Sequence, residues 1–283
     1  MTEQSTLKQT LARLGIRPSR RLGQNFLTDP NMLSALVRDA APTAGDRILE
    51  IGPGTGLLTE RLLEAGATVT AVEIDYRLAA HLRSTLGTHK RLRIIEADAC
   101  RIDPAECMPE DPYRCIANLP YSVSSVVLAR FADTRRPPVD VHVLLQREIA
   151  DRILAEPGTK DYSALSVKVQ LLFEGTVLRT LPPQVFYPPP DVDSAFIRLV
   201  RTPGAVRPGV RRLAVELAQT AFAQRRKKAL KLLGRRWDRD RLQAHFRALG
   251  IDDNARAEAI AVCQYAALAS RLAAAGPTGE APE

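Results

Sequence analysis

Between residues 46 and 145, short apolar runs rich in β-branched residues alternate with amphipathic stretches. The runs predict strands at 47–51, 69–74, 92–95, 114–117 and 139–145, and the stretches between them predict helices at 57–65, 76–86 and 125–132. Strands and helices that alternate along a chain pack as a parallel sheet with helices on both faces. The sequence therefore predicts an α/β protein with a doubly wound, Rossmann-like sheet.

Residues that can bind a ligand stand at the carboxyl ends of four of these strands, the edge at which open α/β sheets hold their ligands. They are Glu50, Gly52 and Gly54 at the first strand, Glu73 and Ile74 at the second, Asp98 and Ala99 at the third, and Asn118, Leu119, Pro120 and Tyr121 at the fourth. Because these strand ends meet at one edge of the predicted sheet, we expect a single binding site there.

The groups at the first three strand ends suit a nucleoside. Glycines let the backbone approach a ligand closely, Glu73 can accept both hydroxyls of a ribose, and Asp98 can accept a hydrogen bond from an adenine amine. The spacing Gly52-x-Gly54-x-Gly56 differs from the GxGxxG of dinucleotide-binding proteins, and no P-loop lysine follows it. We therefore expect a nucleoside cofactor without a pyrophosphate, S-adenosyl-L-methionine rather than NAD.

The fourth strand ends in Asn118-Leu119-Pro120-Tyr121, which combines three groups that can hold an adenine base. Asn118 Oδ1 and the Leu119 carbonyl can accept the two N6 hydrogens, while the Tyr121 ring can stack on the base. Pro120 favours an extended backbone at Leu119, which would turn that carbonyl away from the chain's own hydrogen bonds. By themselves, these four residues are equally typical of a strand that ends in an ordinary proline turn.

The net charge of +8 is concentrated in the last part of the chain. Residues 1–200 contain 24 basic and 24 acidic residues, which leaves 16 basic and 8 acidic residues for 201–283. Pro-Gly pairs at 203–204 and 208–209 indicate a linker at the point where the charge changes. We therefore predict a catalytic domain at 1–200 and a basic helical domain at 201–283, whose small and polar tail, 276–283, is expected to be disordered.

Two basic segments are candidates for contact with RNA. One is an N-terminal arm, in which the basic stretch from Lys8 to Arg21 leads into residues 23–27. The other is a helix predicted at 211–233. The candidate residues are Arg20, Arg21, Arg225, Arg226, Lys227 and Lys228. Such a density of positive charge is what contact with a phosphate backbone requires, although a solvated basic surface would also explain it.

The cysteine and histidine patterns predict no metal site. The four cysteines form no CxxC pair, the four histidines lack ligand spacing, and free thiols are typical of a reducing cytosol. No apolar run approaches the roughly 18 residues of a membrane span, and the N-terminus lacks an apolar signal core. We expect a cytoplasmic monomer that does not contact a membrane.

Motifs spread over residues 15–270 together resemble those of the ribosomal RNA adenine dimethyltransferases. They are Gly23-Gln24-Asn25-Phe26-Leu27, Glu50-Ile51-Gly52-Pro53-Gly54-Thr55-Gly56, Val72-Glu73-Ile74-Asp75, Asn118-Leu119-Pro120-Tyr121, Leu145-Gln146-Arg147-Glu148, Tyr162-Ser163-Ala164-Leu165-Ser166, the run Phe186 to Ala195, the run Ala221 to Lys227, and Arg256-Ala257-Glu258. The resemblance implies a class I methyltransferase fold that uses S-adenosyl-L-methionine. It also implies N6,N6-dimethylation of two adjacent adenosines near the 3′ end of 16S rRNA, in a 30S or pre-30S particle during ribosome biogenesis.

Three alternatives stay open beside that activity. Antibiotic-resistance methyltransferases of the large subunit share most motifs of the first domain, and a mainly non-catalytic assembly factor could retain the same fold. A DNA adenine methyltransferase is less compatible with the fourth-strand motif, which in those enzymes usually has a proline or an acid where Leu119 or Asn118 stands.

The resemblance also implies roles for individual residues. Cofactor contacts are implied for Asn25, Leu27, Gly52, Glu73, Asp98 and Asn118, with Gln24 and Phe26 in the same pocket. Phe186 would be the second stacking wall for the target base, opposite Tyr121, although its chemistry alone also fits a core aromatic beside a rigid proline run. No general base is evident, so positioning and electrostatics are expected to supply most of the rate.

Overall fold

The computed structural model describes residues 3–19, 22–204 and 206–274, and the chain forms two compact units. Unit 1 contains Met1–Ala150 and Gly175–Arg201, and unit 2 contains Asp151–Glu174 and Thr202–Glu283. The boundary predicted at residue 200 lies close to the point where the chain finally leaves unit 1. The sequence did not indicate that residues 151–174 pack with unit 2, where their apolar side chains enter the core of that unit.

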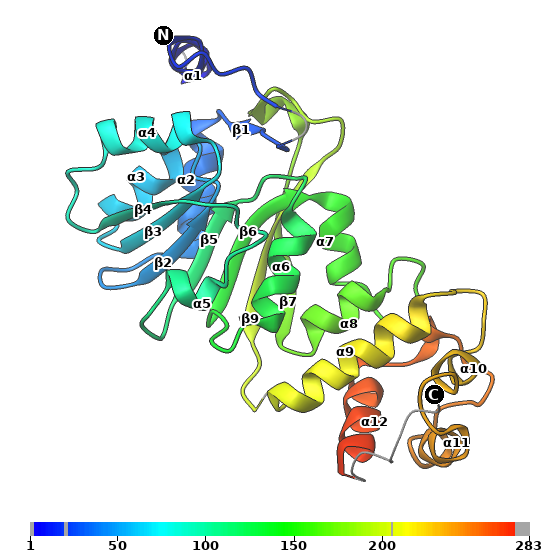
Figure 1. The fold of residues 1–283 in the computed structure, drawn as a ribbon. Helices are drawn as coiled ribbons and strands as arrows, with labels where there is room; N and C mark the ends of the chain where they lie inside the picture. The colour runs from blue at the N-terminus through cyan, green and yellow to red at the C-terminus, as the bar shows by residue number, and fades with distance from the viewer. Residues whose placement is uncertain (1–2, 20–21, 205, 275–283) are drawn as a thin grey trace. The chain divides into compact units, whose positions relative to one another are not determined.

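Unit 1 is built on a seven-stranded sheet with helices on both faces (Figure 1). The strands lie in the order β4 (Leu92–Glu96), β3 (Thr68–Glu73), β2 (Arg47–Ile51), β5 (Arg114–Asn118), β6 (Asp140–Gln146), β9 (Ser194–Arg201) and β7 (Phe173–Leu181). The first five strands in this order are parallel, and within them Ile48 pairs with Val69 on one side and Arg114 on the other. The predicted strands and the Rossmann-like α/β class are therefore confirmed.

Strand β9 departs from the predicted parallel arrangement, because it runs antiparallel to β6. Val141 pairs with Leu199, and Leu145 pairs with Ala195. The chain reaches β9 from β7 through a 3₁₀ turn, η1 (Pro183–Val185), and the short strand β8 (Phe186–Tyr187). In the sheet, β9 lies between β6 and β7.

The helices of unit 1 precede, separate or follow these strands along the chain. They are α1 (Glu3–Arg13), α2 (Pro30–Ala40), α3 (Leu57–Glu64), α4 (Tyr76–Thr85), α5 (Pro104–Cys107) and α6 (Ser124–Asp133), and α7 (Arg147–Ile153) continues into unit 2. Asp75 caps α4 by accepting a hydrogen bond from the Arg77 amide at 2.9 Å, and Asp29 caps α2 in the same way. A separate two-stranded antiparallel pair is formed by β1 (Phe26–Leu27) and β8.

Unit 2 is helical, as the sequence predicts for the C-terminal region. Its elements are α8 (Ala164–Gln170), α9 (Pro208–Phe222), α10 (Ala229–Leu233), α11 (Arg239–Ala248), the 3₁₀ turn η2 (Ala257–Ala259) and α12 (Val262–Ala274). Their apolar faces form one core, in which Leu217, Phe246 and Tyr265 are fully buried. The tail predicted at 276–283 lies outside the described residues.

The single helix predicted at 211–233 is wrong, because the chain forms two helices separated by a turn at residues 223–228. The Ala229 amide donates to the Ala255 carbonyl at 2.8 Å, and Lys228 forms an isolated antiparallel bridge with Arg256. These bonds to a distant segment replace the bonds that would have continued α9. In the ranges the structure describes, no helix is long and apolar enough to cross a bilayer.

Candidate functional site

A pocket in unit 1 opens at the carboxyl ends of β2, β3 and β5 and encloses about 910 Å³, including space open to solvent. Its lining includes twelve of the residues singled out from the sequence: Gln24, Asn25, Phe26, Leu27, Glu50, Gly52, Gly54, Glu73, Ile74, Asn118, Leu119 and Pro120. The structure thus brings together the N-terminal arm and three of the four predicted strand ends.

The glycines after β2 allow three segments to approach one another closely. Gly52 has a φ of 68°, and a Cβ atom there would lie 2.9 Å from the Pro120 ring. Gly54 has a φ of 61°, and a Cβ there would lie 3.0 Å from the Phe26 ring. Residues other than glycine rarely adopt such positive φ values, so both the backbone conformation and the lack of space require glycine at these two positions.

Glu50 is fully buried at the end of β2, where its Oε2 accepts a hydrogen bond from the Thr59 hydroxyl at 2.7 Å. Burial raises the pKa of this carboxyl to about 8, the Thr59 bond opposes the rise, and the nearby Glu73 adds to it. Because the desolvated charged form is disfavoured, the Glu50 carboxyl is largely protonated at neutral pH in this structure. Thr59 was not identified from the sequence, since a threonine inside a helix carries no signal of this contact.

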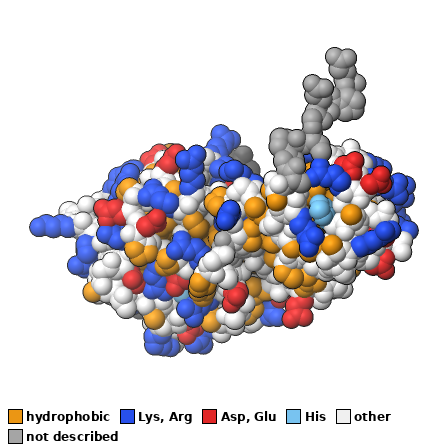
Figure 2. Space-filling view, turned by 90° about the horizontal axis from the view of Figure 1, so that it is seen from below, with side chains coloured by type: hydrophobic (Ala, Val, Ile, Leu, Met, Phe, Trp, Pro, Cys, Tyr) orange, Lys and Arg blue, Asp and Glu red, His pale blue; other side chains and the backbone are white. Residues whose placement is uncertain are grey.

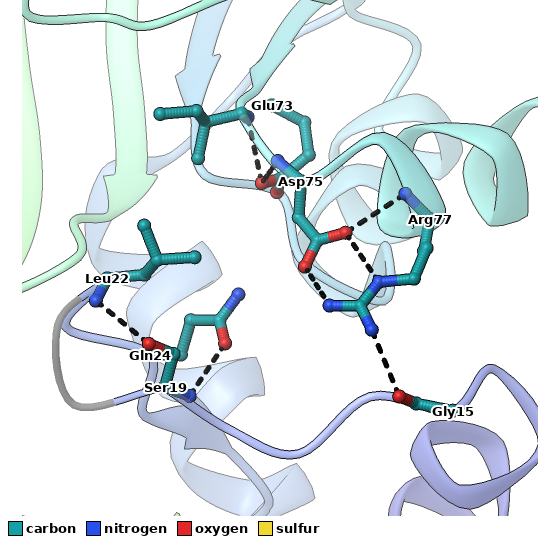
Figure 3. A network of polar contacts seen from close by, with 8 residues as sticks. Gly15, Ser19, Leu22, Gln24, Glu73, Asp75 and Arg77 are labelled. Atoms are coloured by element: carbon teal, nitrogen blue, oxygen red, sulfur yellow. Dashed lines mark hydrogen bonds and ion pairs between the residues drawn. The ribbon is translucent and has the colours of Figure 1, made fainter.

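Glu73 ends β3 with its carboxylate held by backbone amides. Its Oε1 accepts hydrogen bonds from the amides of Ile74 and Asp75, both at 2.9 Å (Figure 3). Its Oε2 accepts one from the Gly54 amide at 3.2 Å. Burial raises the pKa of Glu73, while the three amides partly offset that rise. The amides fix the direction of this carboxylate at the wall of the pocket.

Asn118 ends β5 with one half of its side chain bonded and the other half free. Its Nδ2 donates to the Asn25 carbonyl at 3.1 Å, which fixes the orientation of the amide. Its Oδ1 is buried and has no hydrogen-bond partner among the described residues. A buried acceptor without a partner is costly, so this atom is the one on the pocket wall that most clearly calls for a ligand donor.

The N-terminal arm is joined to the β5 motif through Gly23 as well as Asn25. The Tyr121 amide donates to the Gly23 carbonyl at 3.2 Å. A Cβ at Gly23 would lie 2.5 Å from the Ser122 amide, so this glycine permits the close approach. Gly23 belongs to the motif Gly23-Gln24-Asn25-Phe26-Leu27, but nothing in this motif indicates which segment the glycine contacts.

Tyr121 and Phe186 do not form the pair of facing walls that was predicted. Their ring centroids are 6.4 Å apart with an interplanar angle of 71°, an edge-to-face contact, and the Tyr121 hydroxyl is hydrogen bonded to Ser194. Phe186 is 1% exposed, and neither residue lines the pocket. Phe186 pairs with Leu27 between β8 and β1, which explains why it lies in the core here.

Asp98 and Ala99 also do not line the pocket. Asp98 Oδ1 accepts a hydrogen bond from the Cys100 amide at 2.8 Å, and its Oδ2 lies 3.4 Å from Arg101 Nε. The carboxylate is therefore used by the turn that follows β4. An acid at a strand end predicted a ligand contact, but it serves local structure in this conformation.

The six residues proposed for RNA contact divide into three groups. Arg225 Nη2 donates to the Lys160 and Tyr162 carbonyls at 2.7 and 3.3 Å, and Lys228 Nζ donates to Asn254 Oδ1 at 2.5 Å. Arg226 and Lys227 lie in the same turn, and these four residues are all exposed. Arg20 and Arg21 lie outside the described residues.

Positive charge is not confined to that turn. Figure 2 shows Lys and Arg side chains spread over the visible face.

No cluster of three or more His, Cys, Asp or Glu side chains suited to a metal ion occurs in the described part of the chain.

Comparison with known proteins places this geometry in context. The family model described as ribosomal RNA adenine dimethylase matches residues 16–274. The ribosomal RNA small subunit methyltransferase A of Bordetella bronchiseptica is 40% identical over 266 residues, covering 92% of this chain and 96% of that protein. The protein of the same name from Alkaliphilus oremlandii is 37% identical over 277 residues, covering 94% and 96%.

Two solved structures are similar over most of the chain. A dimethyladenosine transferase from Plasmodium falciparum superposes with a TM-score of 0.74 at 23% identity, covering 88% of this chain and 98% of that one. The 23S rRNA methyltransferase ErmE superposes with a TM-score of 0.67 at 26% identity, covering 88% and 99%. At 23% identity, the first similarity is evidence for the fold of this chain and not for its activity.

Proposed function

The chain belongs to the ribosomal RNA adenine dimethylase family, and we propose that it dimethylates N6 of two adjacent adenosines near the 3′ end of small-subunit 16S rRNA. Relatives that carry the small-subunit name are 37–42% identical to it, whereas the 23S enzyme ErmE is 26% identical. This difference favours the small subunit over the large one. Within the structure, the observation that carries the proposal is the unpartnered Oδ1 of Asn118.

S-adenosyl-L-methionine is the cofactor of this family, and the residues of the pocket fit it. A buried carboxylate at the end of β3 is suited to ribose hydroxyls, and glycines after β2 leave the backbone open to close approach. When bound, the cofactor supplies an electrophilic methyl group on its sulfonium. We assign its contacts to the lining residues Gln24, Asn25, Phe26, Leu27, Glu50, Gly52, Gly54, Glu73 and Ile74.

Asn118 performs the central task in this proposal. The N6 lone pair of adenine is delocalised into the ring, which makes the amine a poor nucleophile. A hydrogen bond from N6 to Asn118 Oδ1, with a second to the Leu119 carbonyl, favours a tetrahedral nitrogen and localises that pair. Because the bond from Nδ2 to Asn25 already fixes the side-chain amide, the acceptor is oriented before the base arrives.

The proposed mechanism requires no general base. The proton can leave N6 after the methyl group has been transferred, so positioning of the amine supplies most of the rate. In the second round the amine has one hydrogen left, and only one of the two acceptors can then be engaged. The pocket must therefore hold the monomethylated base with fewer hydrogen bonds.

Labelled methyl transfer from S-adenosyl-L-methionine to undermethylated small ribosomal subunits tests the proposal, with large subunits measured in parallel and the products mapped. We expect two adjacent dimethyladenosines in 16S rRNA. Label confined to the large subunit would refute the small-subunit assignment. Cofactor binding without transfer to either subunit would favour a role in assembly alone.

Asn118→Ala is the most direct test of the mechanism. We expect a rate loss on the order of 10²–10³, the usual effect of removing one preorganised hydrogen-bonding group, while cofactor affinity measured by calorimetry stays nearly unchanged. Asn31→Ala is the matched control, because Asn31 is exposed on the first turn of α2. Loss of cofactor binding in Asn118→Ala would make this residue chiefly a binding residue.

We further propose that Arg226 and Lys227 contact rRNA phosphates. Both are exposed on a turn that Arg225 and Lys228 hold in place. Replacing Arg226 and Lys227 by alanine should weaken RNA binding and reduce the salt slope of log K by about one for each lost phosphate contact. Arg212→Ala, an exposed arginine on α9, is the control. An unchanged slope would leave the turn as a solvated surface.

The remaining features of the proposal concern where and in what form the protein acts. We propose that it binds a 30S or pre-30S particle as a monomer in the cytoplasm, without contact to a membrane. Sedimentation of the free protein and of its mixture with assembling subunits measures both the oligomeric state and the preferred particle.

A further inference from the structure

The N-terminal arm contributes Gln24, Asn25, Phe26 and Leu27 to the pocket. Besides its bonds to the β5 motif and to β8, it is attached to α4 in two different ways. The first attachment is apolar. Leu7, Leu11 and Ile16 are buried against Leu78 of α4 in a small cluster separate from the main core. This cluster holds α1 and the start of the arm. Because apolar packing is not directional, it does not by itself fix the position of the arm relative to the end of β3.

The second attachment is polar and runs through Arg77 on the first turn of α4. Arg77 Nη1 donates to the Gly15 carbonyl at 3.0 Å, where the arm leaves α1 (Figure 3). Its Nε and Nη2 donate to the two oxygens of Asp75 at 3.2 and 3.0 Å. One guanidinium thus joins the arm to a carboxylate that is itself 7% exposed.

Asp75 connects this contact directly to the carboxylate of the pocket. Its amide donates to Glu73 Oε1 at 2.9 Å, and its side chain caps α4 through the Arg77 amide. Burial alone would raise the pKa of Asp75, but the hydrogen bonds and positive charge of Arg77 lower it overall. The Asp75 carboxylate therefore stays ionised and bonded to the guanidinium across the neutral range.

On these contacts we infer that Arg77 is a positioning residue that sets the N-terminal arm against the end of β3, so that the arm wall and the Glu73 carboxylate bind the cofactor as one unit. The inference rests on the proposed function only in taking S-adenosyl-L-methionine as the ligand. Arg77 itself does not line the pocket, so its effect on the ligand passes through Gly15 on one side and Asp75 on the other.

The geometry requires an arginine rather than any cation. Three nitrogens of one planar group point to three acceptors on two segments. A lysine has a single donor nitrogen and cannot reproduce a bidentate contact to a carboxylate while also reaching a distant carbonyl. Arg77→Lys therefore keeps the charge and breaks the connection.

The test compares Arg77→Ala and Arg77→Lys with the wild-type chain and with Arg83→Ala. Arg83 lies on the same helix and forms an exposed ion pair with Glu96 that does not involve the arm. Hydrogen exchange at residues 16–19 and 22–27 reports on the arm, calorimetry measures S-adenosyl-L-methionine affinity, and methyl transfer gives KM for the cofactor and kcat separately. Thermal melting checks that each variant is folded.

Both Arg77 variants should exchange arm amides faster and bind S-adenosyl-L-methionine about three- to tenfold more weakly, the usual scale for one lost charge-assisted contact at a partly exposed site. KM for the cofactor should rise in proportion while kcat changes less, because Asn118 stays anchored on β5 even where its bond to the Asn25 carbonyl of the arm loosens. A general loss of stability would lower kcat as well.

Three results would overturn the inference. Arm exchange and cofactor affinity in Arg77→Ala equal to those of Arg83→Ala would show that the contact does not position the arm. Wild-type behaviour of Arg77→Lys would show that charge alone suffices. A fall in kcat with unchanged KM would place the role of Arg77 elsewhere. Failure of the wild-type chain to bind S-adenosyl-L-methionine would instead refute the proposed function.

Discussion

Replacing Glu50 by glutamine in the cofactor-free protein should make it more stable at alkaline pH. Glu50 is 1% exposed, and burial raises its pKa from 4.5 to about 8. In the unfolded chain this carboxyl ionises near its ordinary value. Folding at neutral pH therefore requires either uptake of a proton or burial of a charge, and glutamine avoids both while still offering an oxygen to the Thr59 hydroxyl.

The size of the effect follows from the two pKa values. A raised pKa in the folded state means that the full stability is present below pH 4.5 and is lost as the pH rises through 8. The complete loss corresponds to about 5 kcal/mol, at 1.36 kcal/mol for each pKa unit. Between pH 6.5 and 8.5 the Glu50 share of this loss is about 2 kcal/mol, and above that range it levels off.

Urea unfolding at pH 6.5, 7.5 and 8.5 measures this difference. Wild-type protein should lose about 2 kcal/mol more than Glu50→Gln across the series, with equal m-values. Comparison of the two proteins cancels contributions from the buried thiols, whose raised pKa values act in the same direction. Parallel pH dependence in the two proteins would falsify the assignment of this carboxyl as protonated at neutral pH.

Two further substitutions test contacts that shape the site. Gly52→Ala places a methyl group 2.9 Å from a proline ring at a φ of 68° and should cost about 1–3 kcal/mol in urea unfolding as well as cofactor affinity. Gly45→Ala is the control, because Gly45 also has a positive φ but a Cβ there would have nothing within 4 Å, so its loss of stability measures the backbone strain alone. Equal losses of stability in the two variants would show that the contact with the Pro120 ring contributes nothing. Arg114→Ala removes the half-buried cation that pairs with both Asp46 and Asp140, and it should lower the free energy of unfolding by about 3–5 kcal/mol. A loss below about 1 kcal/mol would show that these ion pairs behave as exposed ones.

The strands and the position of the pocket could be predicted because they depend on local patterns. Alternation of apolar and amphipathic segments determines the parallel part of the sheet, and parallel strands necessarily deliver Glu50, Glu73 and Asn118 to one edge. The family resemblance added the N-terminal arm, whose link to Asn118 through the Asn25 carbonyl has no local signal.

The features that were missed depend on contacts between distant segments. The helix predicted at 211–233 ends at Phe222 because the backbone at 228–229 bonds to residues 255–256. Phe186 lies in the core because β8 pairs with β1, and Asp98 is occupied by the turn that follows it. In each case the residue type suited the predicted role, but a tertiary partner decided its use.

The interleaving of the two units has a consequence for synthesis of the chain. The first 150 residues include five parallel strands but not β9, which follows a segment that belongs to unit 2. A chain of that length would present β6 as an unpaired edge, a template for association with other strands. The Ser194 partner of Tyr121 would also still be absent. The catalytic unit can therefore be completed only after the ribosome has added about fifty more residues, so its folding is tied to late elongation.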